Sequence, residues 1–93
     1  MQGKQTRFYT LERMVRGFSN HRRIEILELL EKQPELSVGE IAKVLEIGFK
    51  TAAQHLARLA TAGLVLKRSD GGSIRHKLTD RAQAILKFLR TLA

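Results

Sequence analysis

Positively charged side chains gather in the segment between Gly48 and Leu78, where six bases stand against one acid. The segment between residues 21 and 47 has the opposite balance, with six acids and four bases. In a chain of net charge +8 this distribution favours a polyanionic partner, a nucleic acid first and an anionic membrane surface second. The six bases are Lys50, Arg58, Lys67, Arg68, Arg75 and Lys77.

The chain offers no residue pattern for catalysis or metal binding. We find no Ser/His/Asp set, no carboxylate pair and no phosphate-binding glycine loop, and so small a chain has little volume for a substrate pocket. Cysteine is absent, which leaves no thiolate metal site and no disulfide. His21, His55 and His76 lack the spacing of metal ligands, and we expect His55 to be packed or hydrogen-bonded within a helix. We therefore predict no enzyme, no metal and no cofactor.

Length and hydropathy predict one domain over residues 1–93, with residues 1–6 as a frayed polar tail. No apolar run approaches the roughly 18 residues of a membrane span. The first residues also lack the apolar core of a signal peptide. We expect a soluble, cytoplasmic protein.

The best-marked helix start in the chain is at Ser37. Ser37 and Glu40 have the spacing of a capping box, in which each side chain binds a backbone N–H at the start of a helix. Leu36 and Ile41 stand where a hydrophobic staple would clamp the entering chain. The expected core face of this helix consists of Ile41, Val44 and Leu45.

A second helix, over about residues 49–62, is predicted after a short turn that ends at Gly48. Its apolar positions are Ala52, Leu56, Leu59 and Ala60. A basic hairpin follows over about residues 64–78, and Asp-Gly-Gly supplies the positive φ angles of its turn. In its second strand we expect Ile74, His76 and Leu78 on one face, with Arg75 and Lys77 on the other.

Three further helices are predicted from apolar residues at three- and four-residue steps. The first begins near Arg7, the second is capped by Asn20 and ends before Pro34, and the last is capped by Thr79. The last helix has a wide apolar arc, which covers either the core and a dimer interface or the core alone. The candidate dimer residues are Phe8, Leu11, Val15, Ile85, Phe88, Leu89 and Leu92.

The order helix, turn, helix and hairpin predicts a mainly α fold of about five helices with a two-stranded wing, a winged helix-turn-helix. The major groove of DNA admits an α-helix, and the preceding helix braces it. Gln54 can bind adenine bidentately and Thr51 can meet a thymine methyl, while Lys50 and Arg58 can bind phosphate or guanine. Phe49 either presses on thymine methyls or packs against its helix neighbours.

The remaining polar residues of this segment have no evident base code, so we assign them to the DNA backbone. The plainer alternative is an ordinary solvated hairpin. We expect the acidic side chains between residues 25 and 46 to form a solvated face turned away from DNA. The backbone candidates are Arg58, Lys67, Arg68, Ser73, Arg75 and Lys77.

Residues from about 16 to 88 resemble a small ArsR-type winged-helix repressor. The similar stretches are NHRRIEILELL, SVGEIAKVLEIGFKTAAQHLARLATAGLV and SDGGSIRHKLT. The resemblance implies a homodimer built from the first and last helices, which binds a pseudo-palindromic operator in double-stranded DNA. The cysteine, histidine and acidic ligand sets of metal-sensing members are missing, and Gly48-Phe49-Lys50 departs from the usual polar start of the recognition helix. We therefore expect the DNA sequence that this helix reads to differ from the sequences that family members read.

One alternative uses the same fold without sequence readout. A winged helix can serve as an architectural or protein-interaction module, because one fold hosts many functions. Equal affinity for random and selected duplexes would indicate such a module.

Overall fold

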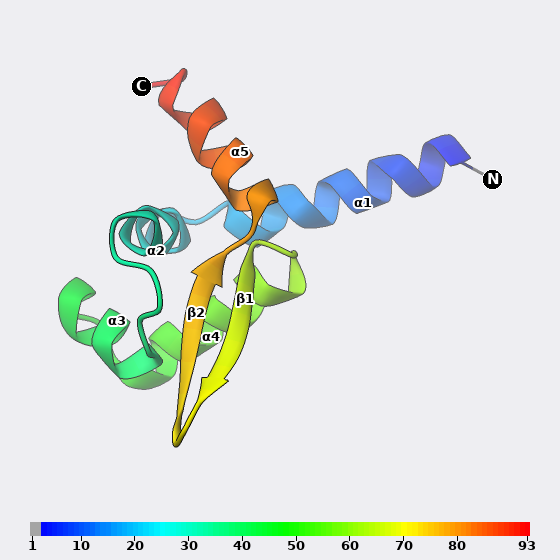
Figure 1. Ribbon diagram of the computed structural model, residues 1–93. Helices are drawn as coiled ribbons and strands as arrows, with labels where there is room; N and C mark the ends of the chain where they lie inside the picture. The colour runs from blue at the N-terminus through cyan, green and yellow to red at the C-terminus, as the bar shows by residue number, and fades with distance from the viewer. Residues whose placement is uncertain (1–2) are drawn as a thin grey trace.

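A computed structural model describes residues 3–93, with side chains from Thr6 onward. Within this part of the chain, five helices and one hairpin confirm the predicted fold class (Figure 1). No helix among the described residues is long and apolar enough to cross a membrane. The elements are α1 (Gly3–Phe18), α2 (His21–Lys32), α3 (Val38–Leu45), α4 (Phe49–Thr61), β1 (Val65–Asp70), β2 (Ser73–Leu78) and α5 (Asp80–Arg90).

Helix α1 begins at Gly3 and projects to one side of the other elements (Figure 1). Of the tail expected over residues 1–6, residues 3–6 belong to this helix, and residues 1–2 lie outside the described part. Lysine and glutamine are good helix formers, and extending a helix that has already formed adds one hydrogen bond for each residue fixed. The polar residues before Arg7 thus continue the helix.

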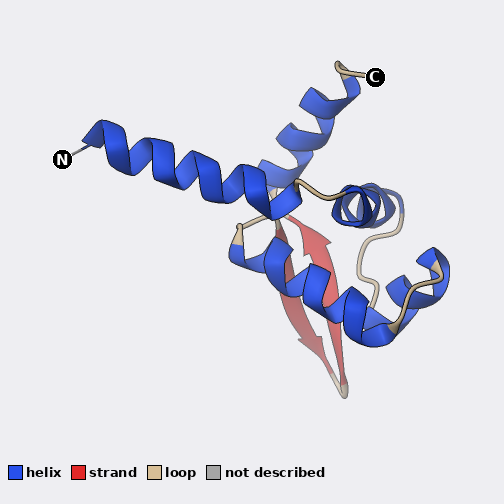
Figure 2. Ribbon diagram, turned by 180° about the vertical axis from the view of Figure 1, so that it is seen from behind, coloured by secondary structure: helices blue, strands red, loops and turns tan. Residues whose placement is uncertain are grey.

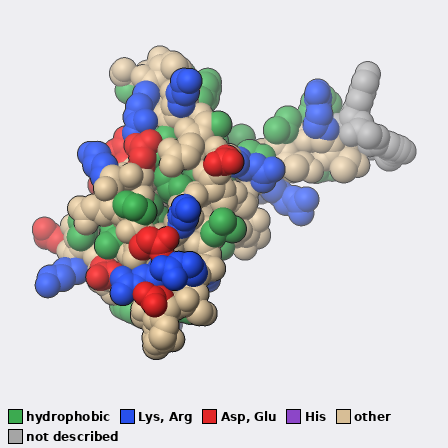
Figure 3. Space-filling view, viewed as in Figure 1, with side chains coloured by type: hydrophobic (Ala, Val, Ile, Leu, Met, Phe, Trp, Pro, Cys, Tyr) green, Lys and Arg blue, Asp and Glu red, His purple; other side chains and the backbone are tan. Residues whose placement is uncertain are grey.

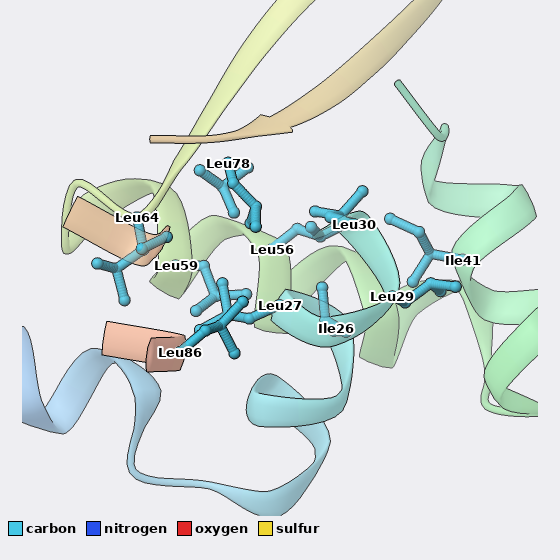
Figure 4. Close-up of a cluster of buried hydrophobic side chains, with 12 residues drawn as sticks. Ile26, Leu27, Leu29, Leu30, Ile41, Leu56, Leu59, Leu64, Leu78 and Leu86 are labelled. Carbon is cyan, nitrogen blue, oxygen red and sulfur yellow. The ribbon is translucent and has the colours of Figure 1, made fainter. Parts of the chain in front are cut away.

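The hydrophobic core lies where α2, α4 and α5 meet the base of the hairpin (Figure 4). Met14 and Phe18 of α1 pack against its edge. Apolar burial of this kind is the main favourable term in folding, and here it fixes α4 between α2 and the hairpin. The largest fully buried aliphatic side chains of the core are Ile26, Leu27, Leu30, Ile41, Leu56, Leu59, Leu64 and Leu86.

The predicted helix caps are present. Asn20 Oδ1 accepts hydrogen bonds from the backbone N–H groups of Arg22 (2.9 Å) and Arg23 (3.1 Å). Thr79 Oγ1 accepts from the N–H of Ala82 at 3.2 Å. Each cap satisfies amide groups that have no partner within the helix.

The two strands pair in antiparallel register from Val65–Leu78 out to Asp70–Ser73, so the turn is only two residues long. Gly71 adopts φ +61°, and a positive φ at the first central residue is typical of a type II′ turn. The hairpin covers residues 65–78, close to the predicted 64–78, and its tip reaches beyond the helices (Figure 1). Alternation along β2 places Ile74 on the same side as the buried His76 and Leu78, and near the tip it is 44% exposed.

The segment after α2 adds a short third strand-like contact to the hairpin, which the sequence analysis missed. Glu35 N–H donates to His76 O at 2.9 Å, and His76 N–H donates to Leu36 O at 3.0 Å. The buried His76 ring also donates from Nδ1 to Leu36 O at 2.8 Å. These bonds tie β2 to the loop that enters α3.

Candidate nucleic-acid interface

Helix α4 presents one face to solvent and buries the other. The buried side chains Ala52, Leu56 and Leu59 hold it in the core. Gly48 provides its N-cap without a side-chain hydrogen bond, so the first amide groups of α4 stay available to an outside acceptor. The exposed residues on the other side include all of the predicted contacts from this helix: Phe49, Lys50, Thr51, Gln54 and Arg58.

The Phe49 side chain is 64% exposed, at the start of α4. Its ring lies beside α3, since a Cβ at Gly39 would be 4.0 Å from Phe49 Cε2, so packing against a helix neighbour stays open. A large apolar ring held in solvent beside Lys50 and Thr51 is placed to meet an apolar group of a ligand. The predicted thymine-methyl contact therefore stays open.

Helix α3 braces the start of α4. Its capping box is complete: Glu40 Oε1 accepts from Ser37 N–H at 2.8 Å, and Ser37 Oγ accepts from Glu40 N–H at 3.2 Å. Glu46 ends the helix in the left-handed region with φ +56°. The chain then turns directly into α4.

Val44 does not belong to the core face of α3, contrary to the prediction. Its side chain is 50% exposed, whereas Ile41 and Ala42 are buried. At 100° per residue, Val44 stands roughly 110° from the centre of the packed face, which also includes the partly buried Leu45. The helix is short and packs on one side only.

Arg68, a basic residue of the wing, is already paired within the protein. Its Nε and Nη2 donate to Glu35 Oε1 at 3.0 and 2.7 Å. Hydrogen bonding to Glu35, then the charge of that carboxylate, raise the pKa of Arg68. The pair joins β1 to the loop between α2 and α3.

The second wing arginine, Arg75, has several acceptors. Its Nη1 donates to Glu35 O at 3.1 Å and to Glu40 Oε1 at 3.2 Å, and its Nε lies 3.5 Å from Asp70 Oδ2. Hydrogen bonds from Ser37 lower the pKa of Glu40, and Arg75 adds to that shift. Acids and bases alternate on this face of the molecule (Figure 3).

The other polar residues of the wing differ in their contacts. Lys67 and Lys77 are exposed and form no ion pair with any described residue, so they are its free cations. Ser73 Oγ donates to Asp70 O at 3.3 Å, within the wing itself. Two acids of the segment that we expected to face away from DNA, Glu35 and Glu40, bind the wing arginines.

His55, on α4, is partly buried and hydrogen-bonded, as predicted. Its Nδ1 lies 3.4 Å from Nη1 of Arg23 on α2. Burial lowers the pKa of His55, and nearby positive charges lower it further. In decreasing order of effect, these charges belong to Arg23, His21, Arg22 and Arg58. Among the described residues, no group of three His, Cys, Asp or Glu side chains could hold a metal ion.

An unpartnered apolar surface lies on α1 and α5, away from the wing. The predicted dimer residues on it are exposed except for Ile85 and Leu89, which are half-buried. Ile85 also packs against the protomer's own core. The exposed fractions are 55% for Phe8, 46% for Leu11, 51% for Val15, 57% for Phe88 and 65% for Leu92.

The arrangement of α3, α4 and the wing can be compared with known proteins. Residues 20–67, about half of the chain, match the model of a family described as bacterial regulatory proteins of the arsR family. The chain belongs to the arsR family. This arsR-family protein is thus a winged helix-turn-helix regulator of transcription, in the class of DNA-binding proteins.

Individual relatives agree with this family. The transcriptional activator HlyU of Vibrio cholerae is 34% identical over 80 residues, which are 85% of this chain and 73% of HlyU. A homodimeric winged helix-turn-helix DNA-binding domain from Mycobacterium bovis superposes with a TM-score of 0.90 at 25% identity, over 99% of this chain and 85% of that one. NolR from Sinorhizobium fredii gives 0.88 at 26% identity, over 99% and 92%.

Proposed function

We propose that this protein is a homodimeric, sequence-specific repressor that binds a pseudo-palindromic site in double-stranded DNA. Helix α4 enters the major groove, and the wing lies on the backbone or in the minor groove. The observation that carries this proposal is the exposed start of α4, where Phe49, Lys50, Thr51 and Gln54 stand together beside an uncapped helix end. Side chains at this end of a recognition helix reach base edges.

The homodimer rests on the exposed apolar side chains of α1 and α5. A surface of this kind marks an interaction site more often than a solvated face. The related domain from Mycobacterium bovis is described as homodimeric. Two copies joined at α1 and α5 would present two α4 helices to one duplex, and a two-fold protein needs a two-fold site.

Repression by occupying promoter DNA is the simplest activity for a chain whose described surfaces suit DNA binding and self-association. The relative HlyU is named an activator, so the sign of regulation needs its own measurement. Transcription in vitro from a promoter that overlaps the site should fall as the protein is added. A rise would assign activation instead. Because its target is chromosomal DNA, we place the protein in the cytoplasm.

Selection from a random duplex pool tests the proposal. We expect enrichment of a two-fold symmetric site with half-sites about one helical turn apart. A pool that stays unenriched, with equal affinity for all duplexes, would favour the architectural or protein-binding module.

A further inference from the structure

A groove of about 930 Å³ lies between α1 and the C-terminal half of α4. Figure 2 shows the two helices from this side, with α1 passing over the end of α4. Five of the thirteen lining residues are arginines, and none is Asp or Glu. The arginines are Arg13, Arg16, Arg23, Arg58 and Arg81.

Most of this charge has no counter-ion among the described residues. Arg16 pairs with Glu12 at 2.9 Å, and Glu12 is not part of the groove lining. Arg13, Arg58 and Arg81 form no ion pair with any described residue. Like charges that are gathered on a concave, partly desolvated surface attract anions strongly.

Arg23, at the inner wall of the groove, also lacks partners for its guanidinium group. Its Nε is buried without a hydrogen-bond partner, and its Nη2 donates to Arg16 O at a long 3.3 Å. Burial, then the charge of Arg58, lower the pKa of Arg23. An anion in the groove would relieve this repulsion.

The groove continues the surface that is proposed to read bases. Gln54 and Arg58 line it from α4, and both are exposed. On α1, Arg13 and Gly17 stand about 160° around the helix from the apolar residues Leu11 and Val15, at 100° per residue. Dimer formation through the apolar side of α1 therefore leaves the groove open.

We propose that this groove binds phosphate groups of the duplex backbone, next to the bases that α4 reads. The inference rests on the proposed function and extends the DNA-binding surface to α1 and to Arg81 of α5. A duplex whose base edges reach Gln54 brings its backbone to the neighbouring arginines of the groove. Phosphate is also a free anion, so the test must separate the two sources.

The test measures the affinity of purified protein for its selected duplex, by fluorescence anisotropy, over a series of salt concentrations. We expect Arg13→Gln and Arg81→Gln each to weaken binding to selected and unrelated duplexes alike. Each variant should also reduce the slope of log affinity against log salt by about one for each protomer. Lys87→Gln, an exposed charge change on α5 outside the groove, should alter neither quantity. Thermal melting confirms that each variant is folded.

Three outcomes would overturn the inference. Unchanged slopes in both groove variants, with wild-type protein binding its site, would refute it and leave the proposed function standing. A wild-type protein that binds no duplex would refute both. If inorganic phosphate shifts the His55 ring signals in a DNA-free NMR titration while the groove variants keep full duplex affinity, the groove serves free phosphate instead.

Discussion

Arg68 on β1 donates two hydrogen bonds to one carboxylate oxygen of Glu35, at 3.0 and 2.7 Å. The two residues are 33 positions apart, and their pairing fastens the wing to the loop before α3. Arg75 reinforces the same junction through Glu35 O. The wing that is proposed to follow the DNA backbone is thus partly neutralised by its own protein.

Replacing Glu35 should therefore strengthen DNA binding. In Glu35→Gln, Arg68 loses its anionic partner and becomes free for phosphate, so affinity for all duplexes should rise and the salt dependence should steepen. The free energy of unfolding should change little, because the ion pair is solvent-exposed. Glu28→Gln, an exposed change on α2, is the control in the same anisotropy titration. Weaker binding by Glu35→Gln alone would show that the pair positions the wing instead.

The crossing of α1 and α4 depends on the absence of a side chain at Gly17. A Cβ at this buried position would lie 2.3 Å from Ala62 Cβ, far inside van der Waals contact. Gly17→Ala should lower the free energy of unfolding by about 1–3 kcal/mol through overpacking, as measured by urea denaturation. Adding Ala62→Gly should restore part of the loss. A single variant as stable as wild type would contradict this account of the crossing.

Substitutions of two exposed valines can distinguish the proposed dimer surface from an exposed apolar residue elsewhere. Val15 on α1 is 51% exposed and Val44 on α3 is 50% exposed. Val15→Asp places a charge in the proposed interface of both protomers, and desolvating an unpaired charge is costly. The dimer should therefore dissociate at concentrations at least tenfold higher than for wild type. Val44→Asp should leave the dimer intact. Sedimentation equilibrium that finds both variants dimeric would remove α1 from the interface.

The stability of the fold should depend on pH through His55. Its pKa in the folded protein lies below the usual 6.5, so just below that pH the unfolded chain binds more protons than the folded one. The free energy of unfolding should then fall as the pH drops below about 6.5. In urea denaturation, His55→Gln should reduce this fall. An identical pH profile for His55→Gln and wild type would contradict the prediction.

Local signals predicted the elements well, because each depends on neighbouring residues. The capping box of Ser37 and Glu40 and the caps at Asn20 and Thr79 act within a single turn. Whether a given side chain is buried was harder to predict, because tertiary packing decides it. Val44 is exposed because α3 packs on one side only, and Ile74 is exposed because the wing extends past the helices.

Contacts between distant segments were not predictable from the pattern. Nothing near Glu35 marks it as a partner of Arg68, because its left-handed φ of +71° and its bond to His76 arise only when the loop meets β2. The arginine groove was missed for a related reason. In the sequence, the side of α1 with Arg13 and Gly17 is indistinguishable from an ordinary solvated surface. It becomes the wall of a groove only when α4 lies beside it.

Site selection with wild-type and Gln54→Ala protein, from one random duplex pool, tests most directly whether α4 reads bases. We expect wild type to enrich a two-fold symmetric site, and Gln54→Ala to lose about 1–3 kcal/mol of discrimination at one base pair in each half-site. Gln83→Ala, an exposed change on α5, should enrich the wild-type site. An unchanged site for Gln54→Ala, or no enriched site for wild type, would contradict the proposal that α4 is the recognition helix.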